Sequence, residues 1–325
     1  MSVVIRSISS YVPPVRITNE ELAARMETTD EWIRSHTGIG ARHIAPDGVQ
    51  TSDMAVSAAQ SALEKAKIGT SDIDYIIVAT ATPDYFGFPA TACIVQDKLG
   101  AYGAAAFDVT AGCTGFIYAL NIASRMLESS HGRHALVIGA DGLSRIVDWN
   151  DRSTAVLFGD GAGAAVVSRI DEGGRGCLSF ILGADGSGAK ELYLVQPERT
   201  QAFDRQQPVV PVISMNGKKV YDFAVKSITV VIERLLHKTA YRLEDFSWIV
   251  PHQANARIVQ AAAKRFSIPM DKIYMNIEEY ANTSAASIPL ALAEMDEKGL
   301  LKPNDLVMLV GFGAGLTYGA AVVRW

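Results

Sequence analysis

The chain has 325 residues, of which 49% are apolar and 20% charged, and this length is enough to bury a large core in about two domains of ordinary size. A net charge of −5 at pH 7 excludes a nucleic-acid-binding role, because phosphate binding requires a dense basic surface. No apolar run reaches the roughly 18 residues of a membrane helix, and the first residues lack the apolar centre of a signal peptide. These two features predict a cytoplasmic protein without membrane contact.

Strand-like and helix-like segments alternate along the chain. Apolar, β-branched runs predict strands at 75–80, 135–138 and 306–310. Apolar residues at helical spacing predict helices at 52–66, 116–128, 220–236 and 256–266. This alternation is typical of a layered α/β protein.

The two halves of the chain end alike on either side of a Gly-dense break at 171–176. GDGAGAAVV at 159–167 closes the first half and GFGAGLTYGAAVV at 311–323 closes the second, each interpreted as a Gly-rich turn followed by a β-branched strand. We interpret this echo as an internal duplication, with two unrelated tight hairpins as the alternative. Neither segment is a dinucleotide fingerprint, because that motif opens a helix.

Cys113 stands where a predicted strand runs into a predicted helix at 114–127. At a helix N-terminus the helix dipole favours a thiolate, and Gly112 and Gly115 leave room for a substrate. A cysteine in an apolar run can equally be an inert core residue, so this segment alone leaves both interpretations open. The three cysteines of the chain are odd in number and form no CxxC pair, which argues against a disulfide framework and a metal site.

Two later segments place polar side chains at similar strand-to-helix switches. WIVPHQANARI at 248–258 puts His252 and Asn255 where a helix begins, and NTSAAS puts Asn282 before another helix start. α/β proteins build their sites at such switches, although a single polar residue there can be a helix cap. Together with Cys113, these residues favour a catalytic constellation.

On these motifs the sequence resembles the β-ketoacyl-acyl carrier protein synthase III family over its full length. The family's triad corresponds to Cys113 in AGCTGF, His252 in VPHQAN and Asn282 in NTSAAS. Further matches are TTDEWI at 28–33, TGI at 37–39, FGDGAGAAV at 158–166 and GFGAGLTYG near the end. The resemblance implies a thiolase-like α/β fold, in which pseudo-duplicated halves at 1–170 (with Cys113) and 171–325 (with His252 and Asn282) form a layered αβαβα core.

The family starts bacterial type II fatty acid synthesis. The resemblance implies that Cys113, as a thiolate, takes an acyl group from acyl-CoA, with acetyl-CoA as the expected primer, while the amides of Cys113 and Ala314 form the oxyanion hole. His252 and Asn282 then donate hydrogen bonds to the enolate that malonyl-acyl carrier protein leaves on losing CO2. Attack of the enolate carbon on acyl-Cys113 gives a 3-oxoacyl-acyl carrier protein and CoA. No cofactor is implied, because the CoA thioester is a substrate.

The resemblance also implies binding residues and a homodimer. Trp32 and Arg152 correspond to residues that hold the adenine of CoA between them, with His36 in a position where many members carry Arg. Asp222 similarly stands where a Lys is common, and both changes remove positive charge near the CoA phosphates. The acyl pocket is expected to be lined by Leu143, Phe312 and a Phe88 that crosses the dimer interface.

A basic helix face is the expected docking site for the acidic acyl carrier protein. Arg257, Lys264 and Arg265 recur at spacings of seven and eight residues, which places them close together on the helix after HQAN. Surface charge of this kind raises encounter rates and is screened by salt. An ordinary solvated face is the alternative.

Three other functions remain as alternatives. Cys, His and Asn also occur in papain-like cysteine hydrolases, although the local signature around that nucleophile is absent here. A non-catalytic homologue is the second alternative, and retention of all three residues argues against it. A condensing enzyme of secondary metabolism is the third, because straight-chain, branched and secondary-metabolite primers differ only in pocket shape. Among condensing enzymes, Asn282 favours the initiating class, since elongating members are expected to carry His there.

Overall fold

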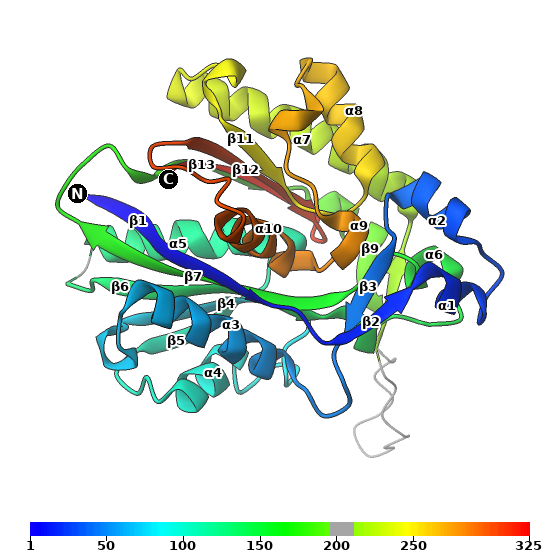
Figure 1. Cartoon of the computed structure of the whole chain (residues 1–325), viewed down its shortest axis with the longest axis horizontal. Helices are drawn as coiled ribbons and strands as arrows, with labels where there is room; N and C mark the ends of the chain where they lie inside the picture. Colours follow the sequence, from blue (N-terminus) through cyan, green and yellow to red (C-terminus); the bar gives the residue numbers. More distant parts are fainter. Residues whose placement is uncertain (130, 196–210) are drawn as a thin grey trace.

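Two mixed β-sheets form the centre of the molecule in the computed structural model, which describes residues 1–129, 131–195 and 211–325 (Figure 1). The strand order of the larger sheet is β1-β7-β6-β4-β5, with bounds Ser2–Tyr11, Asp160–Ile170, His134–Gly142, Tyr75–Ala79 and Ala105–Val109. The order of the smaller sheet is β11-β12-β13-β8, with bounds Trp248–Pro251, Leu306–Gly313, Thr317–Arg324 and Gly176–Ala184. Parallel pairing joins β4 to β5 and β6, and β11 to β12, and all other neighbours in these sheets are antiparallel.

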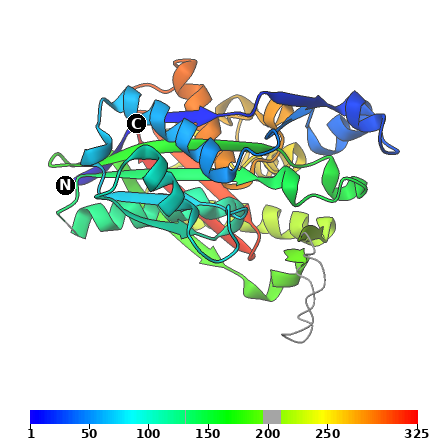
Figure 2. The same cartoon turned by 90° about the horizontal axis from the view of Figure 1, so that it is seen from below.

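Helices cover both sheets and fill the space between them. α5 (Gly115–Ser129) and α10 (Ser287–Glu297) lie between the sheets and share one apolar core with both. α3 (Thr51–Ala66) and α4 (Thr91–Leu99) pack on the outer face of the larger sheet, as the view from below shows (Figure 2). α7 (Gly217–Thr239) and α8 (Ala256–Phe266) pack on the outer face of the smaller sheet. The predicted αβαβα layering is confirmed.

The remaining elements lie together at one end of the layers, on the right in Figure 1. Two of them are small antiparallel sheets, one of β2 (Val15–Thr18) and β3 (Ala41–Ile44) and one of β9 (Leu192–Val195) and β10 (Val212–Met215). The others are four short helices, α1 (Asn19–Ala23), α2 (Asp30–Thr37), α6 (Arg152–Ala155) and α9 (Ile277–Tyr280). In the described ranges, no helix combines the length and the apolar character that crossing a bilayer would require.

One prediction about the Gly-rich segments is wrong. The segment at 159–167 is not a turn, since from Asp160 onward it lies inside β7. A Cβ on Gly163 would come 2.7 Å from the Pro289 Cβ atom and 2.8 Å from the Leu290 nitrogen, so glycine here allows α10 to pack directly on the strand. The segment at 311–323 does contain a turn, between β12 and β13.

Candidate active site

Cys113 lies at the junction of β5 and α5, in a 3-10 turn at Gly112–Thr114 that leads into the helix at Gly115. Its residue surface is only 9% exposed. Gly112 and Gly313 allow the loop at Ala314 to pack closely against Cys113. A Cβ on Gly112, which has φ +52°, would lie 2.9 Å from the Ala314 carbonyl oxygen, and one on Gly313 would lie 2.8 Å from the Cys113 Cβ atom.

The resting state of Cys113 differs from the sequence-based prediction. Burial raises the pKa of the Cys113 thiol to about 12, although hydrogen bonds from Ser284 and from the backbone N–H groups of Cys113 and Ala314 lower it. The nearby Asp141 carboxylate adds to the rise. The expectation of a lowered pKa at the helix N-terminus is therefore wrong, because desolvation outweighs the hydrogen bonds that favour the thiolate. The thiol rests protonated, with the two expected oxyanion-hole amides beside its sulfur.

His252 follows β11, and contacts on the side away from the cleft fix its position. Its backbone N–H donates to the Val310 carbonyl at 2.7 Å, the imidazole is buried, and its ring meets the Phe312 ring edge-on at 5.2 Å. Nδ1 lies 2.7 Å from the Ser287 Oγ, which also accepts a 3.5 Å hydrogen bond from the Gln253 backbone N–H. The single Ser287 hydroxyl proton is thus available for Nδ1, and this pattern assigns the other proton position, Nε2–H, to the pocket.

Burial also fixes the charge of this imidazole. Desolvation lowers the pKa of His252 to about 3, so the ring is neutral at pH 7. A neutral imidazole does not form the thiolate–imidazolium pair by which papain-like enzymes activate their cysteine. His252 is instead a hydrogen-bond donor that does not change charge near neutral pH.

Asn282 precedes α10 and is fixed through its backbone and its side chain. Its N–H donates to the Leu157 carbonyl and its carbonyl accepts from the Gly159 N–H, both at 3.0 Å. Its Oδ1 atom accepts a 2.9 Å hydrogen bond from the Ser284 backbone N–H. Because Oδ1 is occupied in this way, the Nδ2 amide is left to donate. His252 and Asn282 therefore each have a side-chain N–H free to donate into the cleft, and a different hydrogen bond fixes each of them.

The three side chains share one pocket. Cys113, His252 and Asn282 line a cleft of about 240 Å3, together with Trp32, His36, Phe158, Val220 and Phe312. A second, apolar pocket of about 80 Å3 also reaches Cys113, and its walls include Leu143, Ile146, Phe158, Leu192, Ile213, Ser284 and Ala314. Cys113 lies where the two pockets meet.

At the edge of the cleft, two side chains pack against the Trp32 ring. His36 stacks on it with ring centroids 4.5 Å apart and an interplanar angle of 20°, and the Arg152 guanidinium carbon lies 4.8 Å from the ring centroid. Arg152 also donates to the Glu27 carbonyl at 2.9 Å. Stacked rings already need centroids about 4.5 Å apart or more, so a base enters between Trp32 and Arg152 only if Arg152 moves outward.

The structure separates the three residues expected around the acyl group. Leu143 is buried in the small pocket. Phe312 lies in the cleft against His252, because it is near the end of β12 beside β11. Phe88 is 89% exposed and lines neither pocket of this chain.

The charged residues singled out in the sequence lie on the surface. Arg257, Lys264 and Arg265 are exposed on α8, and Arg265 lies 3.9 Å from Glu233 on α7. Asp222 forms a 2.7 Å ion pair with Lys218, one turn away on α7. Among the residues that the structure describes, no group of three or more His, Cys, Asp or Glu side chains is placed to hold a metal ion.

Sequence reasoning did not single out Ser284 and Ser287, which hydrogen-bond to Asn282 and His252, or Asp141, which accepts from the Ala285 N–H between them. Both serines belong to the NTSAAS motif that identified Asn282, so their position was a usable signal. Asp141 is the penultimate residue of the buried strand β6, and a carboxylate near a strand end is a second signal.

A buried cysteine faced by two side-chain donors in an αβαβα fold defines the class of thiolase-fold acyltransferases. The family model for 3-oxoacyl-[acyl-carrier-protein] synthase III matches residues 107–186, and the model for its C-terminal part matches residues 236–325. The chain is 49% identical over 325 residues to β-ketoacyl-[acyl-carrier-protein] synthase III 1 of Bacillus cereus, covering 100% of this chain and 99% of that protein. This chain belongs to the β-ketoacyl-acyl carrier protein synthase III family.

Solved structures agree in fold. The crystal structure of the β-ketoacyl-[acyl carrier protein] synthase III from Thermus thermophilus superposes with a TM-score of 0.91, at 44% identity and 99% coverage of both chains. The priming β-ketosynthase of the R1128 polyketide biosynthetic pathway gives a TM-score of 0.93 at 33% identity, covering 99% of this chain and 96% of that one.

Proposed function

We propose that this enzyme initiates type II fatty acid synthesis. It condenses an acyl-CoA primer with malonyl-acyl carrier protein through an acyl-Cys113 intermediate, and it releases a 3-oxoacyl-acyl carrier protein, CoA and CO2. The observation that carries the proposal is that Cys113, His252 and Asn282 line one cleft, with an N–H left free on each of the latter two.

The two half-reactions use different groups. In acylation the Cys113 sulfur attacks the thioester carbonyl, and the backbone N–H groups of Cys113 and Ala314 receive the developing oxyanion. In condensation the malonyl group loses CO2, and its enolate oxygen accepts hydrogen bonds from the His252 Nε2–H and the Asn282 Nδ2–H. Preorganised donors of this kind typically contribute about 10²- to 10³-fold each.

The small pocket supports a short primer such as acetyl. Its volume is about 80 Å3, as bounded by the described residues. Ordinary small-molecule sites have volumes of about 300 to 1,000 Å3, so this pocket is a small one. Its apolar walls, among them Leu143 and Ile213, suit an alkyl chain rather than a charged one.

Coenzyme A is proposed to enter along Trp32. The indole offers its face to the adenine, and Arg152 closes over the base after moving outward. His36 already stacks on the same ring, and its Nδ1 lies 2.8 Å from the Trp32 carbonyl oxygen. No additional cofactor is proposed, since CoA leaves as a product.

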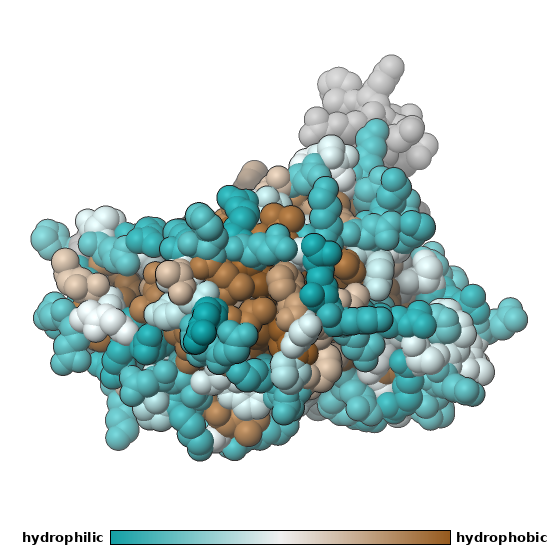
Figure 3. Space-filling model, turned by 90° about the horizontal axis from the view of Figure 1, so that it is seen from above, coloured by the Kyte–Doolittle hydropathy of each residue, from teal (hydrophilic) through white to brown (hydrophobic). Residues whose placement is uncertain are grey.

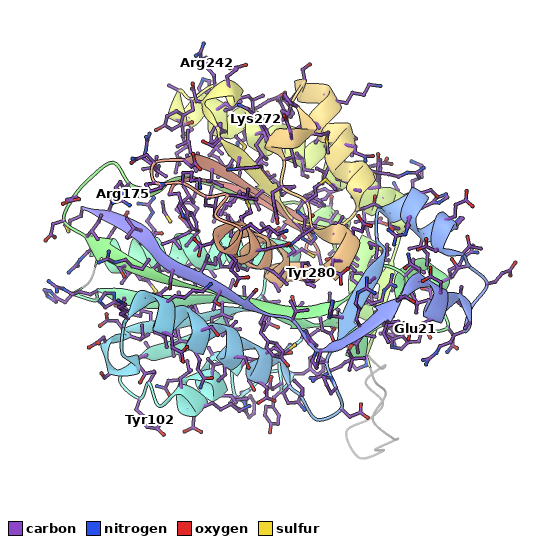
Figure 4. The ribbon with its side chains drawn as sticks, in the orientation of Figure 1. Glu21, Tyr102, Arg175, Arg242, Lys272 and Tyr280 are labelled. Carbon is purple, nitrogen blue, oxygen red and sulfur yellow. The ribbon has the colours of Figure 1, made fainter. Side chains whose placement is uncertain are left out.

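Two copies of the chain are proposed to form a homodimer along β5. This strand is the edge of the larger sheet, and an unpaired edge is a ready site for pairing. Large apolar side chains are exposed in the loop before α4, with Tyr85, Phe86 and Phe88 exposed by 57, 62 and 89%. Tyr102 points outward after α4 (Figure 4). In the dimer, Phe88 would reach toward the acyl pocket of the partner.

The acyl carrier protein is proposed to dock on α8. Arg257, Lys264 and Arg265 are exposed there, and Figure 3 shows hydrophilic side chains around a more apolar centre on this side of the molecule. We further propose the cytoplasm as the working compartment, because the three cysteines of the structure are free thiols and a reducing compartment keeps them so.

Intact-protein mass spectrometry tests the function directly. After acetyl-CoA is added, one acetyl adduct should form on the wild-type chain and none on Cys113→Ser, because an alkoxide is far harder to form than a thiolate. Adding malonyl-acyl carrier protein should then discharge the adduct with release of CO2 and a 3-oxoacyl product. Steady release of free acetate would indicate a hydrolase, and the absence of any adduct would indicate a non-catalytic homologue. A competition among acyl-CoA primers, read by product mass, would identify the preferred chain.

A further inference from the structure

The Thr317 hydroxyl lies between the two backbone segments that carry the expected oxyanion-hole amides. Thr317 is the first residue of β13, and its partner in β12 is Gly313. Its Oγ1 atom lies 2.9 Å from the Ala111 carbonyl oxygen, 3.0 Å from the Ala314 carbonyl oxygen and 3.1 Å from the Thr114 Oγ1 atom. Thr317 is 9% exposed and Thr114 is fully buried. One buried side chain thus joins segments that are 206 positions apart in the sequence.

The amides of Cys113 and Ala314 belong to backbone segments in close contact. A Cβ on Gly112 would lie 3.0 Å from the Ala314 nitrogen, and a Cβ on Gly313 would lie 2.8 Å from the Cys113 nitrogen. Segments this close can present both N–H groups to one reacting carbonyl, as long as the amides keep their orientation. Gly112 and Gly315 beside them have positive φ, +52° and +139°, and glycine is the residue with the widest backbone freedom. The orientation of the amides therefore needs a restraint from outside the two segments.

Thr317 restrains a carbonyl group near each of the two amides. The carbonyl and the N–H of Ala314 share one α-carbon, so fixing the carbonyl limits how far the N–H can turn. The Ala111 carbonyl also accepts from the Thr114 backbone N–H at 3.2 Å, and this bond closes the turn that contains the Cys113 N–H. The Thr317 hydroxyl has one proton for two carbonyls, and the Thr114 hydroxyl can donate its own proton to the Thr317 oxygen. The position of this one oxygen therefore sets the separation of the two segments.

We propose that Thr317 is the positioning residue of the oxyanion hole, an inference that rests on the proposed function. Its hydroxyl holds the amides of Cys113 and Ala314 at the spacing that a tetrahedral oxyanion requires. The hole is used twice, first when the Cys113 sulfur attacks acyl-CoA and again when the enolate carbon attacks acyl-Cys113. Decarboxylation uses His252 and Asn282 instead, and the hydrogen bonds that fix these two side chains come from other residues.

Loss of this positioning should uncouple decarboxylation from condensation. With the oxyanion hole misplaced, malonyl-acyl carrier protein still loses CO2, but attack of the enolate on acyl-Cys113 becomes slow. The enolate carbon then takes a proton from solvent, and the product leaves as acetyl-acyl carrier protein. Each such event releases one CO2 and leaves acyl-Cys113 unchanged, so the CO2 formed exceeds the 3-oxoacyl product.

Three substitutions of Thr317 separate its hydroxyl from its shape. Thr317→Val exchanges the hydroxyl for a methyl group and keeps a β-branched residue in the strand. Thr317→Ala removes the hydroxyl without adding a group beside the carbonyls, and Thr317→Ser keeps the hydroxyl. Acetyl transfer to Cys113 at saturating acetyl-CoA should fall by about 10- to 100-fold in the first two variants, as expected for misplaced catalytic groups, and should stay close to the wild-type rate in the third. The acetyl-CoA concentration for half-saturation should not change, because the Trp32 edge of the cleft is untouched.

The ratio of CO2 to 3-oxoacyl product gives a readout that a merely structural role would not change. In Thr317→Val, acetylated to completion beforehand, this ratio should rise well above one while the rate of decarboxylation stays unchanged. General damage to the site would slow both steps together and leave the ratio near one. Thr229→Val on α7 is the matched control, because Thr229 is 7% exposed, lies outside the cleft and donates to the Val225 carbonyl at 3.0 Å. Its acylation rate and its ratio should match the wild-type values.

Three outcomes would overturn the positioning role of Thr317. They are wild-type acylation in both Thr317→Val and Thr317→Ala, an equal loss in Thr317→Ser, and a ratio of CO2 to product that stays at one while condensation slows. If Thr317→Val does not fold, Thr317→Ala and Thr317→Ser still make the same comparison. Adduct formation and condensation by the wild-type chain test the proposed function by themselves, so its failure is distinguishable from failure of this inference.

Discussion

Ser287→Ala should slow malonyl decarboxylation without affecting acylation. The Ser287 hydroxyl is the hydrogen-bond partner of His252 Nδ1, at 2.7 Å in a buried site, and it keeps the pocket-side proton on Nε2. A buried neutral hydrogen bond contributes about 1 to 1.5 kcal/mol, which corresponds to a five- to tenfold preference for one tautomer and ring orientation. Without this preference the two tautomers become about equally populated, so we expect decarboxylation to fall by about twofold. His252→Ala removes the donor altogether and should cost about 10²- to 10³-fold.

The assay separates the half-reactions. Intact-protein mass spectrometry follows the acetyl adduct, and CO2 release from malonyl-acyl carrier protein follows the second step on the charged enzyme. Nitrogen NMR shifts of 15N-labelled histidine distinguish a protonated from an unprotonated Nε2. Unchanged decarboxylation together with an unchanged tautomer in Ser287→Ala would refute the reasoning, and so would an acylation defect as large as the decarboxylation defect.

Four further predictions follow from the same geometry. His252→Ala and Asn282→Ala should still form the acyl adduct while losing most decarboxylation, and an Asn282→Ala that prevents the adduct but decarboxylates normally would reverse the assigned roles. Decarboxylation by the acetylated enzyme should show no titration of His252 between pH 5 and 8, because the neutral ring is the active form and its pKa is lowered to about 3. Activity is then lost only as the pH falls toward that value, and an inflection near pH 6.5 would contradict this. Arg257→Glu should raise the KM for malonyl-acyl carrier protein at low salt and leave that for acetyl-CoA unchanged, and equal effects would exclude docking there. His36→Arg should tighten CoA binding in calorimetry by restoring a permanent cation, and unchanged affinity would mean that His36 does not face the phosphates.

The sequence by itself determined the layered α/β architecture and the positions of the long elements. The predicted helix at 256–266 is α8 with the same bounds, and the strand at 306–310 lies within β12. These segments were predictable because a buried face leaves a period of 3.6 or 2 in the apolar residues. The sequence also pointed to Cys113, His252 and Asn282, which the structure brings into one cleft, because each stands beside a strand-to-helix switch in a short motif.

The protonation state of the site was decided only by the tertiary structure. Sequence reasoning placed Cys113 at a helix start and expected a lowered pKa, but the opposite shift results from burial, which depends on how closely the Ala314 loop packs against Gly112. The position of a donor on His252 likewise depends on Ser287, a residue 35 positions away along the chain.

Cys113, Ser284 and Asp141 lie on three segments that are distant in the sequence. Each of the three residues is explicable locally as a core thiol, a turn hydroxyl or a strand-end carboxylate. The three segments meet because the turn before α10 packs against β6 and against the turn that carries Cys113, and its Ala285 N–H donates to Asp141 at 3.1 Å. Local periodicity reports which face of an element is buried, whereas the partners that meet across the core are set by the packing of all five layers.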